Sequence, residues 1–182
     1  MRRAVLRRLA LCAAACALGC SNGAAPSAPA SAGSAAQVAP PDFELSTVDG
    51  QSERLSDHLG KEVVLLDFWA TFCEPCLAGM PHLDALYRKH RAEGFVVLGI
   101  AIDGPDSVAQ VKTAVSKLGV SFPILLDQET RVVALYNPKT SAPYSVLIGR
   151  DGRILKKQEG YTTGNADAVE RDIVAALGAP KP

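Results

Sequence analysis

A Cys-x-x-Cys pair that directly follows an apolar run is the feature that most restricts what this chain of 182 residues can fold into. Residues 63–70 are apolar almost throughout, which is typical of a strand buried on both faces of a parallel sheet. The segment Cys73-Glu74-Pro75-Cys76 follows, and Pro75 favours the first turn of a helix because that position needs no N–H. We therefore predict a buried strand leading into a helix whose first turn carries both cysteines.

The positions of the two thiols predict dithiol–disulfide exchange. Free N–H groups and the dipole of a helix N-terminus stabilise a thiolate, so we expect Cys73 to be the nucleophile. Cys76 lies one turn further on and can resolve a mixed disulfide formed at Cys73. Glu74 places a negative charge beside the thiolate, which favours the disulfide form and makes the reduced pair a better electron donor. This chemistry needs no cofactor and no metal.

The N-terminal residues resemble an export signal. Four arginines precede an apolar stretch at residues 9–18, which is too short to span a bilayer. The stretch ends in Ala-Leu-Gly-Cys at residues 17–20, which is similar to a bacterial lipobox. Cys20 would then be lipidated and become the mature N-terminus, and ordinary cleavage after a small residue is the alternative. We expect an exported protein on the periplasmic side of a bacterial membrane, held there by a lipid anchor.

Composition divides the chain into three parts. Residues 1–19 form the predicted signal, and residues 20–40 form a tether of Ala, Ser, Pro and Gly that cannot bury a core. Residues 41–180 suit one domain. Removing the first 19 residues leaves 15 basic side chains against 19 acidic ones, and no basic patch predicts nucleic-acid binding.

Hydrophobic periodicity predicts an α/β domain with a central mixed sheet flanked by helices. Helical connections imply parallel strands, and the turn at residues 150–153 implies an antiparallel hairpin. The predicted strands are residues 43–46, 53–55, 63–69, 95–102, 122–126, 144–148 and 154–159. The predicted helices are residues 55–59, 73–92, 106–118, 129–136 and a last one that begins at Asn165 or Asp167 and ends near Gly178.

Residues 67–76, Asp-Phe-Trp-Ala-Thr-Phe-Cys-Glu-Pro-Cys, resemble the active-site segment of thioredoxins. The longer stretch through Met80-Pro81, together with Phe43 and Phe122-Pro123, is similar to the exported TlpA/ResA branch of that family. The resemblance implies a thioredoxin-like fold over residues 41–178. It also implies an N-terminal β-extension and a helix–strand insertion at residues 104–127.

The resemblance implies a membrane-tethered thiol-disulfide oxidoreductase that reduces protein disulfides. Its substrates would be disulfide-bearing extracytoplasmic proteins, with apocytochrome c as one candidate, and a membrane thiol carrier would re-reduce it. A disulfide oxidase or isomerase and a non-enzymatic module binding copper or another metal are the alternatives. A peroxiredoxin-type peroxidase is disfavoured, because it needs Pro and Thr at a set spacing that Thr71, two residues before Cys73, does not provide.

The family also carries a cis-proline that faces the cysteines, and the matching position here is Pro143. Cis peptide bonds are almost confined to proline, and a proline at the start of a strand costs no ladder hydrogen bond. We expect Pro143 to keep the Cys73 pocket open and the backbone of Ala142 to pair with a substrate strand. Trp69 and Phe72 would form an apolar rim around the thiols and contact the substrate, together with Glu74 and Pro75, and plain core packing is the alternative for Trp69.

Two positions depart from the TlpA/ResA branch. Gly79 stands where that branch commonly has Glu, three residues after the second cysteine, and Asp67 stands where it often has Asn. Asp67 matches the buried acid of thioredoxins instead. A carboxyl on a buried strand is desolvated, so its pKa rises toward the working range of a proton acceptor. We predict that Asp67 takes the proton of Cys76 during the resolving step, and a solvated or salt-bridged carboxyl at the strand end is the alternative.

Overall fold

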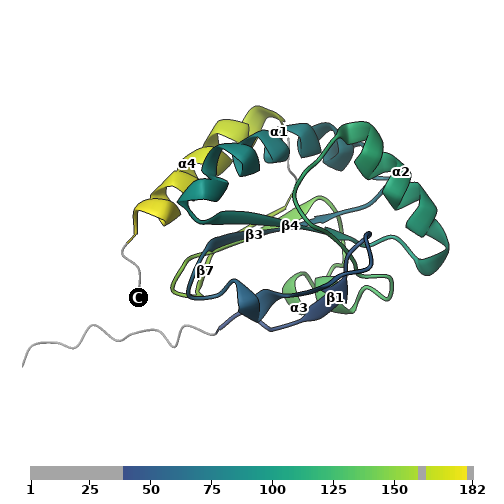
Figure 1. Ribbon diagram of the computed structural model, residues 1–182, viewed down its shortest axis with the longest axis horizontal. Helices are drawn as coiled ribbons and strands as arrows, with labels where there is room; N and C mark the ends of the chain where they lie inside the picture. The colour runs from purple at the N-terminus through teal and green to yellow at the C-terminus, as the bar shows by residue number, and fades with distance from the viewer. Residues whose placement is uncertain (1–38, 160–162, 180–182) are drawn as a thin grey trace, which may run out of the picture. The chain divides into compact units, whose positions relative to one another are not determined.

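Three strongly apolar segments form the parallel half of a five-stranded sheet in the computed structural model, which describes residues 39–159 and 163–179 (Figure 1). The strand order is β5-β4-β3-β6-β7, with β3 in the centre. The parallel strands are β3 (Val63–Trp69), β4 (Phe95–Ala101) and β5 (Ile124–Leu126). The antiparallel strands are β6 (Tyr144–Ile148), beside β3, and β7 (Ile154–Glu159) at the edge. The predicted mixed sheet is confirmed.

Helices cover both faces of the sheet (Figure 1). One face packs against α1 (Glu74–His90), α2 (Val108–Leu118) and α4 (Ala166–Gly178). The other face packs against α3 (Arg131–Tyr136) and the hairpin of β1 (Glu44–Ser46) and β2 (Ser52–Arg54). Side chains of a strand alternate between faces. In β3, Leu65 and Trp69 therefore lie in the core under α1, whereas Leu66 and Phe68 lie in the core above α3.

The element bounds differ from the predicted ones mainly at element ends. The predicted strand 122–126 is shortened to residues 124–126, because Pro123 has no N–H to give to the ladder. The Pro123 carbonyl still accepts the N–H of Gly99, at 3.0 Å. The predicted helices 73–92 and 106–118 each include a 3₁₀ turn, at Arg91–Glu93 after α1 and at Pro105–Ser107 before α2. Two further 3₁₀ turns are Leu55–Asp57 and Thr163–Asn165.

The predicted N-terminal β-extension and the predicted insertion at residues 104–127 lie against each other. The insertion supplies α2 and the edge strand β5, which pairs with β4. Val48, in the turn of the β1–β2 hairpin, donates its N–H to the carbonyl of Ile124 at 2.9 Å, and Thr47 bridges to Leu125. The hairpin therefore covers the free edge of β5, which would otherwise present unpaired backbone groups.

Several predictions about the N-terminus fall outside the described residues. These are the signal at residues 1–19, the lipidation of Cys20 and all but the last two residues of the tether. Within the part of the chain that the structure describes, no helix has the length and apolar character needed to cross a membrane.

The carboxylate of Asp84 joins α1 to the insertion. It accepts the backbone N–H of Ser121 at 2.6 Å and the Ser121 hydroxyl at 2.7 Å, and it is buried. Asp84→Ala removes the single oxygen, Oδ1, that accepts both Ser121 donors, and also the Oδ2 partner of Arg88, so we expect the free energy of unfolding to fall by about 2–3 kcal/mol in denaturant titrations. Asp84→Asn keeps an oxygen at the same place and should cost about 1 kcal/mol or less. Equal losses in the two variants would contradict this role.

Candidate active site

The two cysteines lie in the first turn of α1 and are joined by a disulfide. The two sulfurs are 2.01 Å apart and the two Cα atoms 5.3 Å apart. Cys73 is the N-cap residue of the helix and Pro75 lies in its first turn, as the motif predicts. Both cysteines are nearly buried, at 7% and 4% exposed. The structure therefore shows the oxidised form of a pair whose thiolate the helix terminus would stabilise after reduction.

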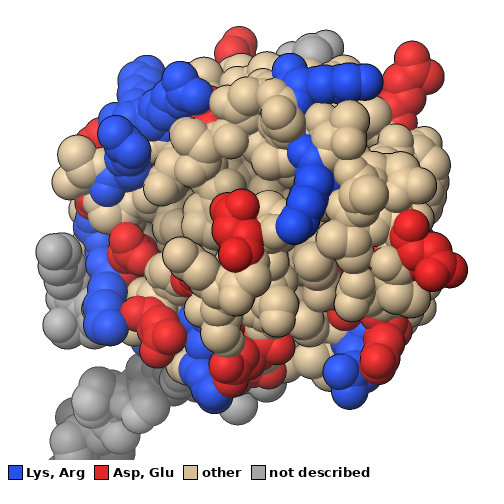
Figure 2. All heavy atoms as spheres, turned by 45° about the vertical axis from the view of Figure 1, so that its right-hand side comes forward, with Lys and Arg blue, Asp and Glu red and all other residues tan. Residues whose placement is uncertain are grey.

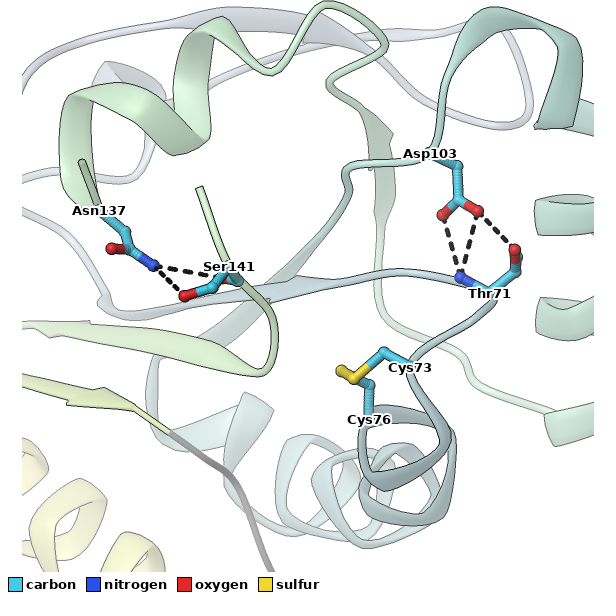
Figure 3. The surroundings of a disulfide bond; sticks show 6 residues. All are labelled: Thr71, Cys73, Cys76, Asp103, Asn137 and Ser141. Carbon is cyan, nitrogen blue, oxygen red and sulfur yellow. Dashed lines mark hydrogen bonds between the residues drawn. A yellow bond between two sulfur atoms is a disulfide. The ribbon is translucent and has the colours of Figure 1, made fainter. Parts of the chain in front are cut away.

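A buried carboxylate holds the loop that leads to Cys73. Asp103 follows β4 just as Thr71 follows β3, and the carboxyl ends of parallel strands meet at one edge of a sheet. The Asp103 carboxylate accepts the Thr71 N–H at 3.1 and 3.2 Å and also the Thr71 hydroxyl (Figure 3). Asp103 is not among the site residues predicted from the sequence. Its place directly after the second strand of a predicted parallel pair is the signal that points to it.

A second buried polar side chain organises the loop that leads to Pro143. The Asn137 amide donates to the carbonyl of Ser141 at 3.2 Å and to its hydroxyl at 3.0 Å (Figure 3). Its oxygen accepts the N–H of Lys139 at 3.1 Å. The Ala142–Pro143 peptide bond that follows is cis, as the resemblance implies. Ala142 packs against the core cluster on the α1 face of the sheet, and that cluster contains both cysteines.

The expected rim around the thiols is only partly present. Phe72 is 79% exposed, and Glu74 and Pro75 are exposed at the start of α1. Trp69 is fully buried, so the prediction that it lines the rim and contacts substrate is wrong. The alternation of β3 explains this, because Trp69 points from the last position of the strand into the core under α1.

Asp67 is a buried acid on the face of the sheet that α1 covers. It lies between Leu65 and Trp69 in the alternation of β3 and is 4% exposed. Burial raises the pKa of Asp67 to about 7, and none of the described residues offsets this with a hydrogen bond or a charge. Its neighbours across the sheet explain why, since Gly99 has no side chain and Ser145 has no charge. Asp67 can therefore gain or lose a proton near neutral pH.

Other charged groups are distributed over the surface. Figure 2 shows Lys and Arg interspersed with Asp and Glu on one face, with broad uncharged areas between them. His58 is hydrogen-bonded to Glu53 and Glu62, and His90 to Glu93. Across residues 39–159 and 163–179, no three His, Cys, Asp or Glu side chains are grouped as metal ligands.

Comparison with known sequences relates the chain to redox proteins. Residues 36–157 match the model of the AhpC/TSA family. The thiol-disulfide oxidoreductase ResA of Bacillus cereus is 33% identical over 123 residues, which cover 68% of this chain and 69% of that protein. ResA of Geobacillus thermodenitrificans is 32% identical over 142 residues, which cover 78% of this chain and 76% of that protein.

Comparison with solved structures supports a thioredoxin-like fold. A protein of Chlorobium tepidum described as thiol:disulfide interchange protein DsbE matches with a TM-score of 0.71 and 33% identity. The match covers 77% of this chain and 96% of that protein. A protein of Neisseria meningitidis described as a thioredoxin matches with a TM-score of 0.63 and 29% identity, over 75% of this chain and 88% of its own.

The burial of Asp67 predicts how the free energy of unfolding depends on pH. Its pKa is about 7 in the folded protein against an ordinary value of 3.8, so the folded state binds the proton more tightly. The contribution of Asp67 to the free energy of unfolding is therefore fully present below about pH 4 and is lost as the pH rises through 7, and a shift of about three units is worth about 4 kcal/mol. We compare the change in the free energy of unfolding that Asp67→Asn causes at two pH values. We expect this change to be more stabilising at pH 8 than at pH 4 by up to about 4 kcal/mol.

Denaturant unfolding of the oxidised protein and of the Asn variant at the two pH values measures this difference. Comparing the two pH values cancels any change in packing that the amide introduces, because packing does not depend on pH. The same effect at pH 4 and pH 8 would show that the carboxyl is solvated in the folded protein.

Proposed function

This chain belongs to the AhpC/TSA family and, like its ResA relatives, is a thiol-disulfide oxidoreductase, and we propose that it works as a reductase of disulfides in extracytoplasmic proteins. The observation that carries the proposal is the Cys73–Cys76 pair at the N-terminus of α1, with Glu74 as the first helical residue. A negative charge beside the Cys73 thiolate favours the disulfide, so the reduced pair gives up its electrons readily.

The reaction proceeds by two exchanges. The Cys73 thiolate attacks a substrate disulfide, forming a mixed disulfide and releasing one substrate thiolate. The Cys76 thiolate then attacks the sulfur of Cys73, which forms the disulfide seen here and releases the second substrate thiolate. Two electrons pass from the cysteine pair to the substrate, and each released thiolate takes up a proton from water.

Asp67 is the proposed proton acceptor for Cys76. The alternation of β3 puts the carboxyl under α1, in the same core layer that contains Cys76. A carboxyl with a pKa of about 7 is partly ionised at neutral pH, so it can take up the thiol proton and release it again. The thiolate of Cys76 is then available for the resolving attack.

The substrate segment is proposed to lie between the start of α1 and the loop before β6. Exposed Phe72, Glu74 and Pro75 surround Cys73 on one side, and Ala142 and the cis bond to Pro143 form the other. We expect the backbone of Ala142 to pair with an extended substrate strand, a mode of recognition that uses main-chain hydrogen bonds.

The proposed location is the periplasmic side of a bacterial membrane. The lipobox-like residues 17–20 support a lipid anchor at Cys20, and the segment that follows, to residue 40, would let the domain reach proteins near the membrane. Disulfide-bearing exported proteins, including apocytochrome c, are the proposed substrates. A membrane thiol carrier is the proposed source of electrons.

The reduction potential of the Cys73–Cys76 pair tests the direction of electron flow. We expect the purified mature protein, equilibrated in thiol redox buffers, to show a value at or below about −230 mV, in the range of thioredoxin-like reductants. A value above about −150 mV would mark an oxidant and contradict the proposal. Failure to form a reversible bridge would favour the metal-binding alternative instead.

The role of Asp67 is tested in the reaction of the reduced protein with Ellman's reagent, which releases one coloured thiolate at each exchange. We expect Asp67→Asn to slow the second release roughly 100-fold at pH 8 and to leave the first nearly unchanged. In the unmodified protein the second rate should rise with pH through about 7, because the acceptor must be ionised. Cys76→Ser is the control that gives only the first release. A second rate that is the same in the Asn variant would remove Asp67 from the mechanism.

A further inference from the structure

The chain between β3 and the cysteines is tied to β4 by a side chain in place of a backbone carbonyl. Trp69 is the last residue of β3, and its carbonyl accepts the N–H of Ile102 at 2.9 Å. In a regular parallel pair, the Ile102 carbonyl would then accept the N–H of Thr71. Thr71 donates instead to the carboxylate of Asp103, at 3.1 and 3.2 Å. The chain can therefore turn away from the sheet without leaving this N–H unpaired.

The anchored residue belongs to the turn that ends at the nucleophile. Cys73 donates its N–H to the carbonyl of Ala70 at 3.0 Å, which closes a turn over residues 70–73. Within this turn Thr71 gives both its N–H and its hydroxyl to Asp103 (Figure 3), whereas the side chain of Phe72 is exposed. The contact between Thr71 and Asp103 therefore fixes the direction in which the chain reaches Cys73.

Asp127 shows what an acid at the end of a parallel strand does when its role is only structural. It follows β5 as Asp103 follows β4, and its carboxylate accepts the N–H of Val133, six residues on, in the first turn of α3. Helical residues also follow Asp103, but the turn at Pro105–Ser107 and the start of α2 have no side-chain cap. The carboxylate of Asp103 reaches back 32 residues to the cysteine loop. Its contact with Thr71 is therefore not a helix cap.

The anchor is itself held in place on both sides. Asp103 is 5% exposed, Ile102 before it is bonded to the Trp69 carbonyl, and Ser107 after it donates its N–H to the Gly104 carbonyl at 2.9 Å. A buried carboxylate that loses its donors is left without solvation, which costs more than an ordinary hydrogen bond. The contact therefore resists displacement of the turn that carries the nucleophile.

We propose that Asp103 is a positioning residue for the nucleophile: through Thr71 it holds the sulfur of Cys73 where Cys76 can attack it. The resolving exchange needs the Cys76 thiolate aligned with that sulfur, and small displacements of reacting atoms cost large factors in rate. The same alignment raises the effective concentration of one thiol toward the other, which stabilises the closed disulfide. The inference rests on the two exchanges at Cys73, and it depends neither on the direction of electron flow nor on Asp67.

Thr71→Val and Thr71→Ser form a matched pair, because Val keeps the branched shape without the hydroxyl, whereas Ser keeps both donors to Asp103. In the reaction of the reduced protein with Ellman's reagent, we expect Thr71→Val to slow the second thiolate release about fivefold and Asp103→Ala about 30-fold. Thr71→Ser should keep most of the rate. The slowing should be the same at pH 6 and pH 9, since no proton passes through Asp103 in this role. Equal slowing in the Val and Ser variants, or none in the Val variant, would overturn the proposal.

The reduction potential is a second readout, and a residue that only supported the fold would not move it. A tenfold loss of effective concentration makes the disulfide easier to reduce and raises the potential by about 30 mV, a rise that we expect in Asp103→Ala. Asp103→Asn keeps an oxygen for the Thr71 N–H and should show a smaller rise. Denaturant unfolding verifies that each variant is folded, and a folded Asp103→Ala protein with an unchanged potential would contradict the positioning role. Failure of the unmodified protein to form a reversible bridge would refute the proposed function instead.

Discussion

The central position of β3 determines where the reactive groups meet. β3 is parallel to β4 on one side and antiparallel to β6 on the other. Its carboxyl end therefore lies beside the carboxyl end of β4 and the amino end of β6. Cys73 follows β3, Asp103 follows β4 and Pro143 precedes β6, so three segments distant in the sequence converge at one edge. Hydrogen bonds then fix two of these segments. Asp103 binds the loop before Cys73 at Thr71, and Asn137 binds the loop before Pro143 at Ser141.

The same strand carries a conflict between stability and chemistry. A leucine in place of Asp67 would suit the core, since its neighbours in the layer are Leu65 and Trp69. The carboxyl instead disfavours folding once it is ionised, and the desolvation that causes this also brings its pKa to about 7. The apolar strand is long and fully buried on both faces, so the sheet tolerates the loss. The cost of burying the ionised carboxyl and its pKa are thus set by one quantity, the access of water to Asp67.

The sequence predicts β3, β6 and β7 at their observed bounds, because β3 is an almost continuous apolar run and the turn at residues 150–153 separates β6 from β7. It also predicts both cysteines at the helix start and the burial of Asp67. The contacts of Asp103 and Asn137 are harder to foresee. Thr71 lies 32 residues from Asp103, and only the register of the strands shows that they meet. The prediction that Trp69 lines the rim is wrong for a related reason. The motif shows that Trp69 is close to the thiols in the sequence, but it does not show to which face of the sheet its side chain points.

Gly79 leaves the helix without a side chain that could act on the proton of Cys76. A carboxyl at this position, common in the TlpA/ResA branch, would lie one turn after Cys76 on α1. Here the position is buried and has no side chain, so the helix brings no acid to the resolving thiol at that site. Asp67 faces the same layer from below, opposite Ser145 of β6. An acid on a central strand has no direct exposure to water, unlike one on a helix near the surface.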